Sequence, residues 1–515
     1  MKIRLNQLRV KLDHNDADLK AAVTKALGGR AGGFEVLRRS VDARSRTLPP
    51  AWIYQLEVEV TDDFDLSLVS SATLAPEPLE PYTLPSVSPA KRPVVVGAGP
   101  AGLLAAITLA EAGAKPLVIE RGESTEERSR KVAKFWEAGA LDTESNALYG
   151  EGGAGLFSDG KLTARSKDRK RIRRLFEVLI ECGAPKEILT ESDPHIGTDV
   201  LRKVIPAMRD RIEQLGGEVR FSAHLDCVII DDGRLVGVQI NGEEIATDVC
   251  ILAAGHSARD VYTMLHDCGV ALEAKPFAVG VRAEMPQDQI AMSQYGRSWE
   301  NPGLPTASFR MTRREEKGAR ACYSFCMCPG GQVIACSSSE GEITTNGMSF
   351  HARNSGWGNA AFLVPVTVAD YAKYASKTVP AELAGIEFQR NMEQRAFKAA
   401  GENYALPVQR MSEFLAGEGA SDLPRERSCT RAAAANLRDM LPGFVVGTLQ
   451  ATLSKMLRGL RGVRFEDVLL YGAETRSSAP VRVLRDETGQ STTAAGLFPC
   501  GEGAGYAGGI VSSAI

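Results

Sequence analysis

The strongest chemical signal in the sequence is the glycine-rich segment GAGPAG at residues 97–102. It follows an apolar run at 94–96 and opens a segment with helical spacing at 103–112. In such a strand–turn–helix, the first glycine permits the tight turn, the second lets the main chain approach a pyrophosphate, and the third lets helix and strand pack closely. The free N–H groups of the helix start then attract the phosphates. We therefore predict that Gly97, Gly99, Pro100, Ala101 and Gly102 form part of the cofactor-binding site.

Glu120 ends the next predicted strand, 116–120, about twenty residues after the start of the motif. A carboxylate at this place accepts hydrogen bonds from ribose hydroxyls. The spacing fits FAD and NAD equally, although the Pro100-Ala101 filling resembles fingerprints of the FAD type.

Two other segments, 150–155 and 503–508, match the same pattern of glycines. The first follows the polar run 143–146 instead of an apolar strand, and the second lacks a following strand with an acidic residue. We expect neither to be a dinucleotide site. The chain therefore lacks the second fingerprint that a pyridine nucleotide reductase with two Rossmann domains would carry.

Candidate reacting groups lie in or directly after predicted strands of the middle region. His256 follows the apolar run 249–253 and is a candidate proton donor, or else it satisfies main-chain groups near a cofactor. Arg282 and Glu284 alternate on one face of a predicted strand. They form a buried Arg–Glu pair, or Arg282 holds an anionic substrate.

Glu474 and Arg476 lie in a polar segment with Ser477 and Ser478, just before the last predicted strand. They are candidates for contact with a substrate or cofactor, and a solvated surface loop is the alternative.

The sequence has ten cysteines, of which Cys322, Cys326 and Cys328 cluster. In a strand, Cys326 and Cys328 would share one face, as structural thiols or as redox thiols. A C-x-C pair alone is weak for zinc or iron–sulfur, so we expect no metal site. The scattered pattern, without a CxxC pair, is typical of reduced thiols in the cytoplasm.

The order of the predicted elements divides the chain into parts. Residues 1–72 have strand–helix–strand–strand order, which predicts a small ferredoxin-like α+β module. Residues 73–92 are a proline-rich linker. The dinucleotide-binding domain is expected at 93–274 and closes at 431–515, with a mixed α+β substrate domain inserted at 275–430.

Bulk composition excludes several classes of protein. A length of 515 residues predicts two or three domains, and a net charge of -3 does not favour nucleic acid as a partner. The basic run at 165–174 indicates a solvated helix face, with an anionic partner such as RNA as the alternative. The N-terminus lacks the apolar region of a signal peptide, and no apolar run is long enough to span a membrane.

Longer motifs add a family resemblance over nearly the whole chain. They are SVDAR at 40–44, GAGPAG at 97–102, GEGGAGLFSDGK at 150–161, IGTDVL at 196–201, AGHSARD at 254–260, KPFAVGVR at 275–282, FCMCPGG at 325–331, NGMS at 346–349, ETRSSAP at 474–480 and PCGEGAGYAGGIV at 499–511. The chain resembles bacterial FAD-dependent dehydrogenases with an N-terminal ferredoxin-like domain, whose members are mostly uncharacterised. Members usually continue with a helix past Ile515, so we expect further C-terminal residues.

The resemblance implies a glutathione-reductase-like FAD fold and assigns residues to the cofactor. Glu120 would contact the adenosine ribose, Leu225 the adenine, and the small residues of 150–161 and 501–510 the flavin ring. The helix start at Ile510 would favour the negative charge of reduced flavin. The further implied contacts are Arg121, Arg128, Gly153, Ala154, Gly155, Ser158, Asp159, Gly160, Lys161, Ala254, Gly255, Gly501, Glu502, Gly508 and Gly509.

These signals together predict a cytoplasmic α/β flavoprotein enzyme. We expect FAD to exchange a hydride with a small organic substrate, which would be anionic if Arg282 binds it. The electron donor or acceptor and the oligomeric state stay open. The alternative is a flavin-bearing scaffold whose N-terminal module recognises a partner or metabolite.

Overall fold

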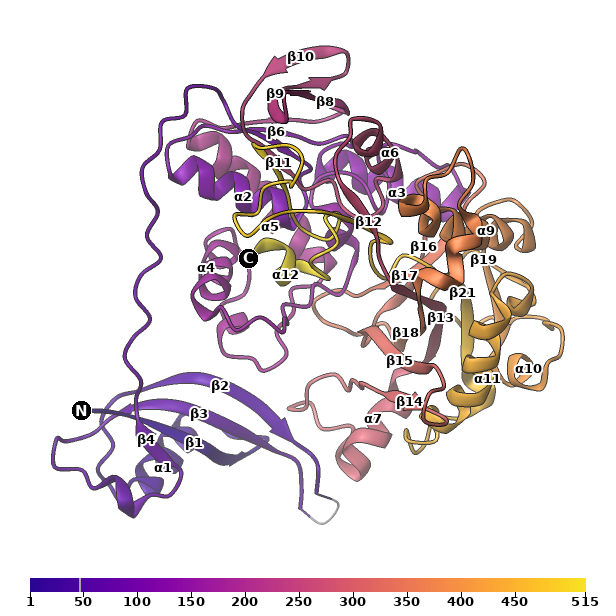
Figure 1. Ribbon diagram of the computed structural model, residues 1–515. Helices are drawn as coiled ribbons and strands as arrows, with labels where there is room; N and C mark the ends of the chain where they lie inside the picture. The colour runs from indigo at the N-terminus through magenta and orange to yellow at the C-terminus, as the bar shows by residue number, and fades with distance from the viewer. Residues whose placement is uncertain (46–47) are drawn as a thin grey trace.

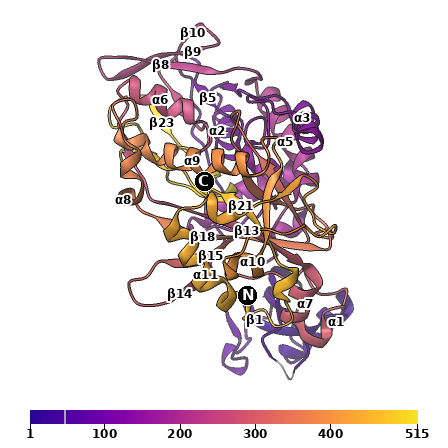
Figure 2. The same cartoon turned by 90° about the vertical axis from the view of Figure 1, so that its right-hand side faces the viewer.

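The computed structural model describes residues 1–45 and 48–515, and its three largest sheets have seven, five and four strands. The four-stranded sheet belongs to the N-terminal module. In Figures 1 and 2 this module lies at the opposite end of the molecule from the β8–β10 meander. Among the described residues we find no helix with the length and apolar character that a bilayer crossing needs.

The N-terminal module is an antiparallel sheet with strand order β2-β3-β1-β4, packed on helix α1. Its elements are β1 (Lys2–Lys11), α1 (Asp16–Ala26), β2 (Phe34–Asp42), β3 (Ala51–Glu59) and β4 (Ala72–Leu74). Because β3 lies between β1 and β2, the helix makes a split β-α-β unit, as a ferredoxin-like module requires. A single 3-10 turn, Leu66–Leu68, stands where that fold has its second helix.

The module is attached to the rest of the chain at two places. Residues 75–93 contain no helix or strand and run along the molecule to β5 (Figure 1). Arg39 exchanges main-chain hydrogen bonds with Thr190 and Ser192, at 2.7 and 3.1 Å, and its guanidinium pairs with Glu191. The module is therefore docked by main-chain contacts as well as tethered.

The five-stranded sheet confirms the expected Rossmann-type arrangement. Its order is β23-β11-β5-β6-β7, and all four pairings are parallel. The strands are β5 (Val94–Val96), β6 (Leu117–Ile119), β7 (Glu218–Arg220), β11 (Cys250–Leu252) and β23 (Leu497–Pro499). The three consecutive valines of β5 are buried, as is typical of a parallel strand covered on both faces.

Helices and a small meander surround this parallel sheet. They are α2 (Pro100–Glu111), α3 (Thr125–Ala138), α4 (Arg169–Glu181), α5 (Thr198–Gln214), α6 (Arg259–Asp267), α12 (Ile510–Ala514), β8 (Leu225–Asp231), β9 (Arg234–Ile240) and β10 (Glu243–Ala246). The strand-like segments 219–221, 226–230 and 235–240 predict a three-stranded meander, but residues 219 and 220 belong to β7 in the parallel sheet, and the third meander strand is β10.

The seven-stranded sheet forms the second large domain, with order β14-β15-β18-β13-β21-β19-β20. Its strands are β13 (Phe277–Pro286), β14 (Thr312–Arg314), β15 (Ala321–Cys328), β18 (Trp357–Val366), β19 (Leu406–Arg410), β20 (Ala432–Ala434) and β21 (Leu469–Glu474). The other elements here are α7 (Gln287–Tyr295), β16 (Gln332–Cys336), β17 (Thr344–Met348), α8 (Val368–Tyr371), α9 (Ala384–Ala399), α10 (Met411–Ala416) and α11 (Gly443–Leu457).

The expected boundary at residue 430 falls inside this second domain. Strands β20 and β21 belong to its sheet, and buried residues of α11 join its core. The chain returns to the parallel sheet only after β21. It enters the second domain through β12 (Leu272–Ala274) and leaves it through β22 (Val481–Val483), and these two strands pair with each other.

The packing of α2 on β5 depends on Gly102. A Cβ at this position would overlap the carbonyl oxygen of Gly97 and touch Val95 at 3.4 Å. We predict that Gly102→Val lowers the free energy of unfolding by about 1–3 kcal/mol, because this contact has no room for a side chain. Urea unfolding of the apoprotein measures the change.

Gly447→Val is the matched control, since Gly447 is also helical and a Cβ there would meet nothing within 4 Å. We expect its unfolding midpoint to stay near that of the parent. Equal losses for both variants would contradict the assigned packing.

Candidate functional site

In the turn between β5 and α2, no side chain caps the N-terminus of the helix, so its first N–H groups are left without a side-chain partner. Gly97 has a φ of 97°, and a Cβ there would overlap the carbonyl oxygen of Ala253. Gly99 is the N-cap residue and offers no side-chain cap, while Pro100 opens the helix. The first N–H groups of a helix have no partner inside it, so this end can accept an anion.

Glu120 connects the turn with a second glycine-rich segment. Its buried carboxylate accepts hydrogen bonds from the amides of Ala98 at 2.8 Å, Gly122 at 3.1 Å and Gly150 at 3.0 Å. A carboxylate has about four lone-pair sites, so one remains after these three bonds. Contact between Glu120 and a ribose stays a prediction.

Three glycine-rich segments, 97–102, 150–155 and 501–510, meet at the start of α2. The amide of Gly152 donates to the carbonyl oxygen of Ala98 at 2.8 Å. A Cβ at Gly153 would lie 3.1 Å from the Cα of Gly99, and a Cβ at Gly155 would lie 3.4 Å from Ile510. Segments up to four hundred residues apart therefore lie in contact, and that 150–161 and 501–510 both line the flavin stays a prediction.

The edge of this junction consists of bare main chain. A Cβ at Gly255, Gly508 or Gly509 would meet no atom within 4 Å. Behind this edge, Gly503 packs on Gly255, because a Cβ at Gly503 would lie 2.7 Å from the Gly255 carbonyl oxygen. A flat ligand could thus approach the main chain on one side while the other side is closely packed.

The two arginines assigned to the cofactor have different surroundings. Arg128 is fully buried and donates to the carbonyl oxygens of Asn146, Gly150 and Glu151, so it supports the 150–155 segment from below. Burial lowers the pKa of Arg128 to about 10. Arg121 pairs with Glu144 and Asp260.

Arg121 also lines a pocket of about 320 Å³. The other lining residues are Glu123, Lys131, Asp142, Glu144, Ser145, Ser222, His224 and Asn241. Leu225, the predicted adenine contact, is the buried first residue of β8 and follows His224.

Polar residues at the end of the 150–161 segment attach it to the second domain. Asp159 pairs with Arg353 at 2.5 Å and accepts a hydrogen bond from Ser349. Although burial opposes ionisation, Arg353 holds the pKa of Asp159 below its usual value. Lys161 donates to the carbonyl oxygen of Met327. Ser158 instead stays local, donating to Gly155 at 2.7 Å.

Arg282 is fully buried and forms a bidentate pair with Glu474, at 2.9 and 2.7 Å. Its remaining N–H groups donate to Cys326 O, Asn359 Oδ1 and Asn346 Oδ1. All five donors are thus engaged, which leaves none for an anionic substrate. Although burial opposes the charge, Glu474 raises the pKa of Arg282. The Arg–Glu pair exists, but its partner is Glu474; Glu284 accepts from Tyr471 and Ser428 instead.

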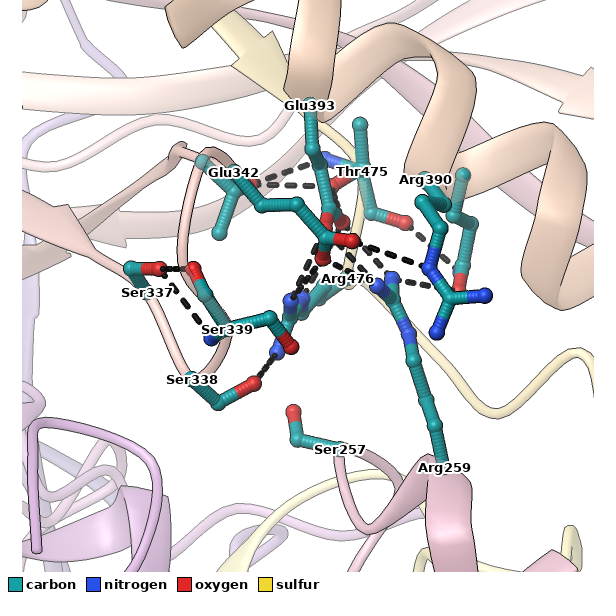
Figure 3. A network of polar contacts seen from close by, with 12 residues as sticks. Ser257, Arg259, Ser337, Ser338, Ser339, Glu342, Arg390, Glu393, Thr475 and Arg476 are labelled. Atoms are coloured by element: carbon teal, nitrogen blue, oxygen red, sulfur yellow. Dashed lines mark hydrogen bonds and ion pairs between the residues drawn. The ribbon is translucent and has the colours of Figure 1, made fainter. Parts of the chain in front are cut away.

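Arg476 belongs to a second buried network, which Figure 3 shows in detail. Glu393 of α9 is fully buried and accepts from Arg259 at 2.8 and 2.9 Å and from Arg476 at 2.8 and 3.0 Å. Burial would raise the pKa of Glu393, but the two guanidinium groups hold it well below its usual value. Arg476 also donates to Ser338. The network joins α6 of the parallel-sheet domain to the second domain.

His256 lies between this network and the C-terminal segment. Its Nε2 is 2.8 Å from the carbonyl oxygen of Arg476, and its Nδ1 is 3.5 Å from Glu502. Glu502 accepts from the amide of Gly509. His256, Glu502 and the bare edge at Gly509 are therefore connected. Within the described ranges, no cluster of three or more His, Cys, Asp or Glu is placed to hold a metal ion.

The remaining predicted residues pack around the junction. Gly501 approaches Ala101, because a Cβ at Gly501 would lie 2.9 Å from that of Ala101, and Gly160 packs on Gly197 in the same way at 2.8 Å. Ala154 and Ala254 are half-buried against the core of the parallel-sheet domain.

Three residues of the buried network around Arg476, namely Arg259, Glu342 and Glu393, were not predicted from the sequence. Glu342 accepts a hydrogen bond from Arg259 at 2.9 Å. Arg259 lies within the AGHSARD motif, so that motif was a signal. No local pattern marks Glu393, since its partners Arg259 and Arg476 lie 134 and 83 residues away in the chain.

Profiles of three known families match successive parts of the chain. Residues 2–60 match a domain of unknown function. Residues 91–273 match the family described as pyridine nucleotide-disulphide oxidoreductase, and residues 276–477 match the one described as FAD-dependent protein, C-terminal domain-like.

Individual proteins are similar over different lengths. An uncharacterized protein of Clostridium beijerinckii is 40% identical over 536 residues, covering 100% of this chain and 97% of that protein. Protein FixC of Escherichia coli is 28% identical, over 38% of this chain and 44% of FixC. The probable electron transfer flavoprotein-quinone oxidoreductase YdiS of Escherichia coli is 28% identical, over 41% of this chain and 49% of YdiS. The match thus spans about half the length of FixC and YdiS.

Among solved structures, CtdE in complex with FAD aligns over 81% of this chain and 78% of CtdE, with 11% identity and a TM-score of 0.32.

The Arg282–Glu474 pair yields a stability prediction. Arg282→Met leaves the Glu474 carboxylate buried without its partner, so we expect it to lower the free energy of unfolding by about 3–5 kcal/mol. The double variant Arg282→Met/Glu474→Gln should lose less than the sum of the two single variants, because neither charge is then stranded. Denaturant unfolding of all four proteins gives the coupling energy.

Arg310–Asp193 is the control pair, since its side chains are 78% and 70% exposed. We expect Arg310→Met to change stability by less than about 1 kcal/mol. Strict additivity of the Arg282 and Glu474 variants would show that the two residues do not act as a pair.

Proposed function

The chain belongs to an FAD-dependent oxidoreductase family, and on that basis we propose that it exchanges a hydride between a small organic substrate and FAD. The observation that carries this proposal is the junction of the three glycine-rich segments, with bare main chain at Gly255, Gly508 and Gly509. A flat ring can pack against main chain that carries no side chains. The free N–H groups at the uncapped N-terminus of α2 can bind a pyrophosphate beside that ring.

The residues at the junction suit each part of FAD. Gly97, Gly99 and Gly102, with the first amides of α2, would hold the pyrophosphate. Glu120 would hold the adenosine ribose with its remaining lone pair, and the pocket beside Arg121 and His224 would take the adenine. The main chain of Gly153–Gly155 and of 508–510 would line the flavin. When bound, FAD supplies a ring that takes up or releases a hydride.

We assign the protein side of the proton transfer to His256. Its Nε2 faces a carbonyl oxygen, which only accepts hydrogen bonds, so Nε2 must carry a hydrogen. A second proton on Nδ1 would lie between the imidazole and the carboxylate of Glu502. His256 can therefore hold or release a proton at Nδ1, next to the edge formed by Gly509.

Arg282, Glu474 and Arg476 are better described as positioning residues than as catalytic residues. Glu393 and Ser338 engage Arg476, and the donors of Arg282 are fully used. The network of Arg259, Glu393 and Arg476 would fix the second domain against the FAD-binding domain, so that the substrate is held near the flavin and water is excluded. The Arg282–Glu474 pair would hold strands β13 and β21 together inside the second domain. An electron-transfer partner remains part of the proposal, because YdiS is described as a probable electron transfer flavoprotein-quinone oxidoreductase.

Gly99→Val tests the cofactor site. A Cβ at Gly99 would touch only the Cα of Gly153, at an ordinary 3.7 Å, and its φ of -80° suits any residue. The variant should therefore fold, yet its side chain would fill the place of the pyrophosphate. We expect loss of the flavin absorbance in the purified protein with an unchanged far-ultraviolet circular dichroism spectrum.

Gly447→Val serves as the control and should retain one flavin per chain. A folded Gly99→Val protein that still carries stoichiometric FAD would mean that the pyrophosphate lies elsewhere.

The enzyme itself is tested by anaerobic bleaching of the flavin. We expect a member of a panel of small hydroxy acids, amino acids and amines to bleach the holoprotein with saturating kinetics. NADH and NADPH should act slowly and without saturation, because the chain has a single fingerprint with the strand–turn–helix context. If dithionite alone reduces the flavin, the hydride-transfer proposal fails and a scaffold role gains support.

A further inference from the structure

Cys326 and Cys328 lie at a distortion of strand β15. The pairing of β15 with β18 shifts register between Phe325 and Cys328, and Cys326 has a φ of 42°. In a regular strand, alternate Cα atoms are about 6.6 Å apart, near the upper limit for a disulfide. A bulge disrupts the ladder and bends the strand. The side chains of Cys326 and Cys328 therefore do not follow the spacing of a regular strand.

The surroundings of the pair shift the pKa values of the two thiols in opposite directions. The Cys328 thiol donates to the carbonyl oxygen of Cys326 at 3.5 Å, and it lies close enough to the Cys326 side chain to stabilise a negative charge there. Lys161 and Arg282 also favour that charge. Glu474 opposes that charge, and Asp159 acts against ionisation of Cys328. The neighbouring Cys328 side chain, more than the two cations, lowers the pKa of Cys326 to about 7, and Cys326 together with burial raises the pKa of Cys328.

Other cysteines have the opposite character. Burial raises the pKa of Cys322, Cys336 and Cys429 to about 12. These thiols stay protonated at neutral pH and are inert. The residue Cys326 is half-buried, whereas Cys328 is fully buried.

We propose that Cys326 and Cys328 form a redox-active dithiol that reduces a small hydroperoxide, an activity separate from the proposed hydride transfer. The Cys326 thiolate attacks the distal oxygen of the peroxide, the O–O bond breaks, and the leaving alkoxide or hydroxide takes up a proton. Cys326 is then a sulfenic acid. The Cys328 sulfur attacks the Cys326 sulfur, an S–S bond forms, and water leaves with the Cys328 proton. Overall, two thiols and one hydroperoxide give one disulfide, one alcohol or water, and one water.

The class of substrate follows from the site. A hydroperoxide is small and uncharged, which suits a half-buried thiolate between two cations and two carboxylates. The fixed charges of Lys161 and Arg282 are held in place by hydrogen bonds to the main chain at Met327 and Cys326. They can therefore stabilise the thiolate before reaction and the charge that develops on the leaving oxygen.

A second pair of cysteines provides an internal control. The sulfurs of Cys227 and Cys268 are only 3.4 Å apart and both are half-buried. Burial and Cys227 raise the pKa of Cys268 to about 11. If proximity alone decided oxidation, this pair would react as readily as Cys326 and Cys328.

The experiment treats the reduced, desalted holoprotein with one equivalent of hydrogen peroxide under argon at neutral pH. Free thiols are then alkylated, and the protein is digested with trypsin and analysed by mass spectrometry without reduction. We expect the fragment 321–353 to lose the mass of two hydrogens, with Cys326 and Cys328 protected and Cys322 and Cys336 alkylated. Even against a thiol of ordinary pKa, about 8.5, the disulfide should form about threefold faster or more.

Two further measurements separate the roles of the sulfurs. The rate should rise with pH through about 7 and then level off, because the thiolate of Cys326 reacts. Cys328→Ser should stop at a sulfenic acid on Cys326 that dimedone traps, while Cys268→Ser should behave as the parent. Circular dichroism and flavin content check that each variant is folded.

Several outcomes would overturn the proposal. They are a disulfide that appears first at Cys227–Cys268, dimedone labelling of Cys328→Ser at a residue other than Cys326, and a rate that is flat across neutral pH. The mapping of the parent protein needs no variant, so it stays decisive even if Cys328→Ser fails to fold.

Discussion

Main-chain segments at the centre of this molecule approach one another more closely than side chains would allow, and the site depends on that contact. Gly97 lies against Ala253, Gly102 against Gly97, and Gly503 against Gly255. Each contact excludes a Cβ, so the parallel strands, the start of α2 and the C-terminal segment can share one small volume. The same absence of side chains leaves bare main chain at the edge, where FAD is proposed to lie.

Two buried charge networks support this arrangement, one between the two domains and one inside the second domain. Glu393 and Glu342 together neutralise Arg259 and Arg476, and Glu474 neutralises Arg282 within the second domain. Buried ion pairs add little net stability, because desolvation offsets their attraction. They do, however, penalise any arrangement that leaves one charge without its partner. The role of the Arg259–Glu393 network is therefore to select one relative placement of the two domains, which is what a reaction between a bound ring and a substrate requires.

The fold was largely predictable from local patterns. The strand–turn–helix is encoded within about ten residues: the valines of β5, the glycine fingerprint and the start of α2. The apolar run and the glycine spacing of this short segment predict the three elements directly. Prediction was wrong where several placements satisfied the same pattern. Residues 219–221 were predicted as a meander strand, but residues 218–220 pair with β6 in the parallel sheet. The predicted end of the second domain at residue 430 was wrong, because β20 and β21, which follow that residue, pair with strands of the second domain's sheet.

The sequence by itself determined which residues lack side chains and which carry charge: the glycines of 97–102, 150–155 and 501–510, and the polar groups Arg282, Glu474 and Arg476. Tertiary structure alone decided how they are paired. Arg282 faces Glu474, 192 residues away, instead of Glu284 two residues away, because β13 pairs with β21. The physical reason is that local spacing sets the face of a strand on which a side chain lies, whereas its partner depends on which strand packs beside it.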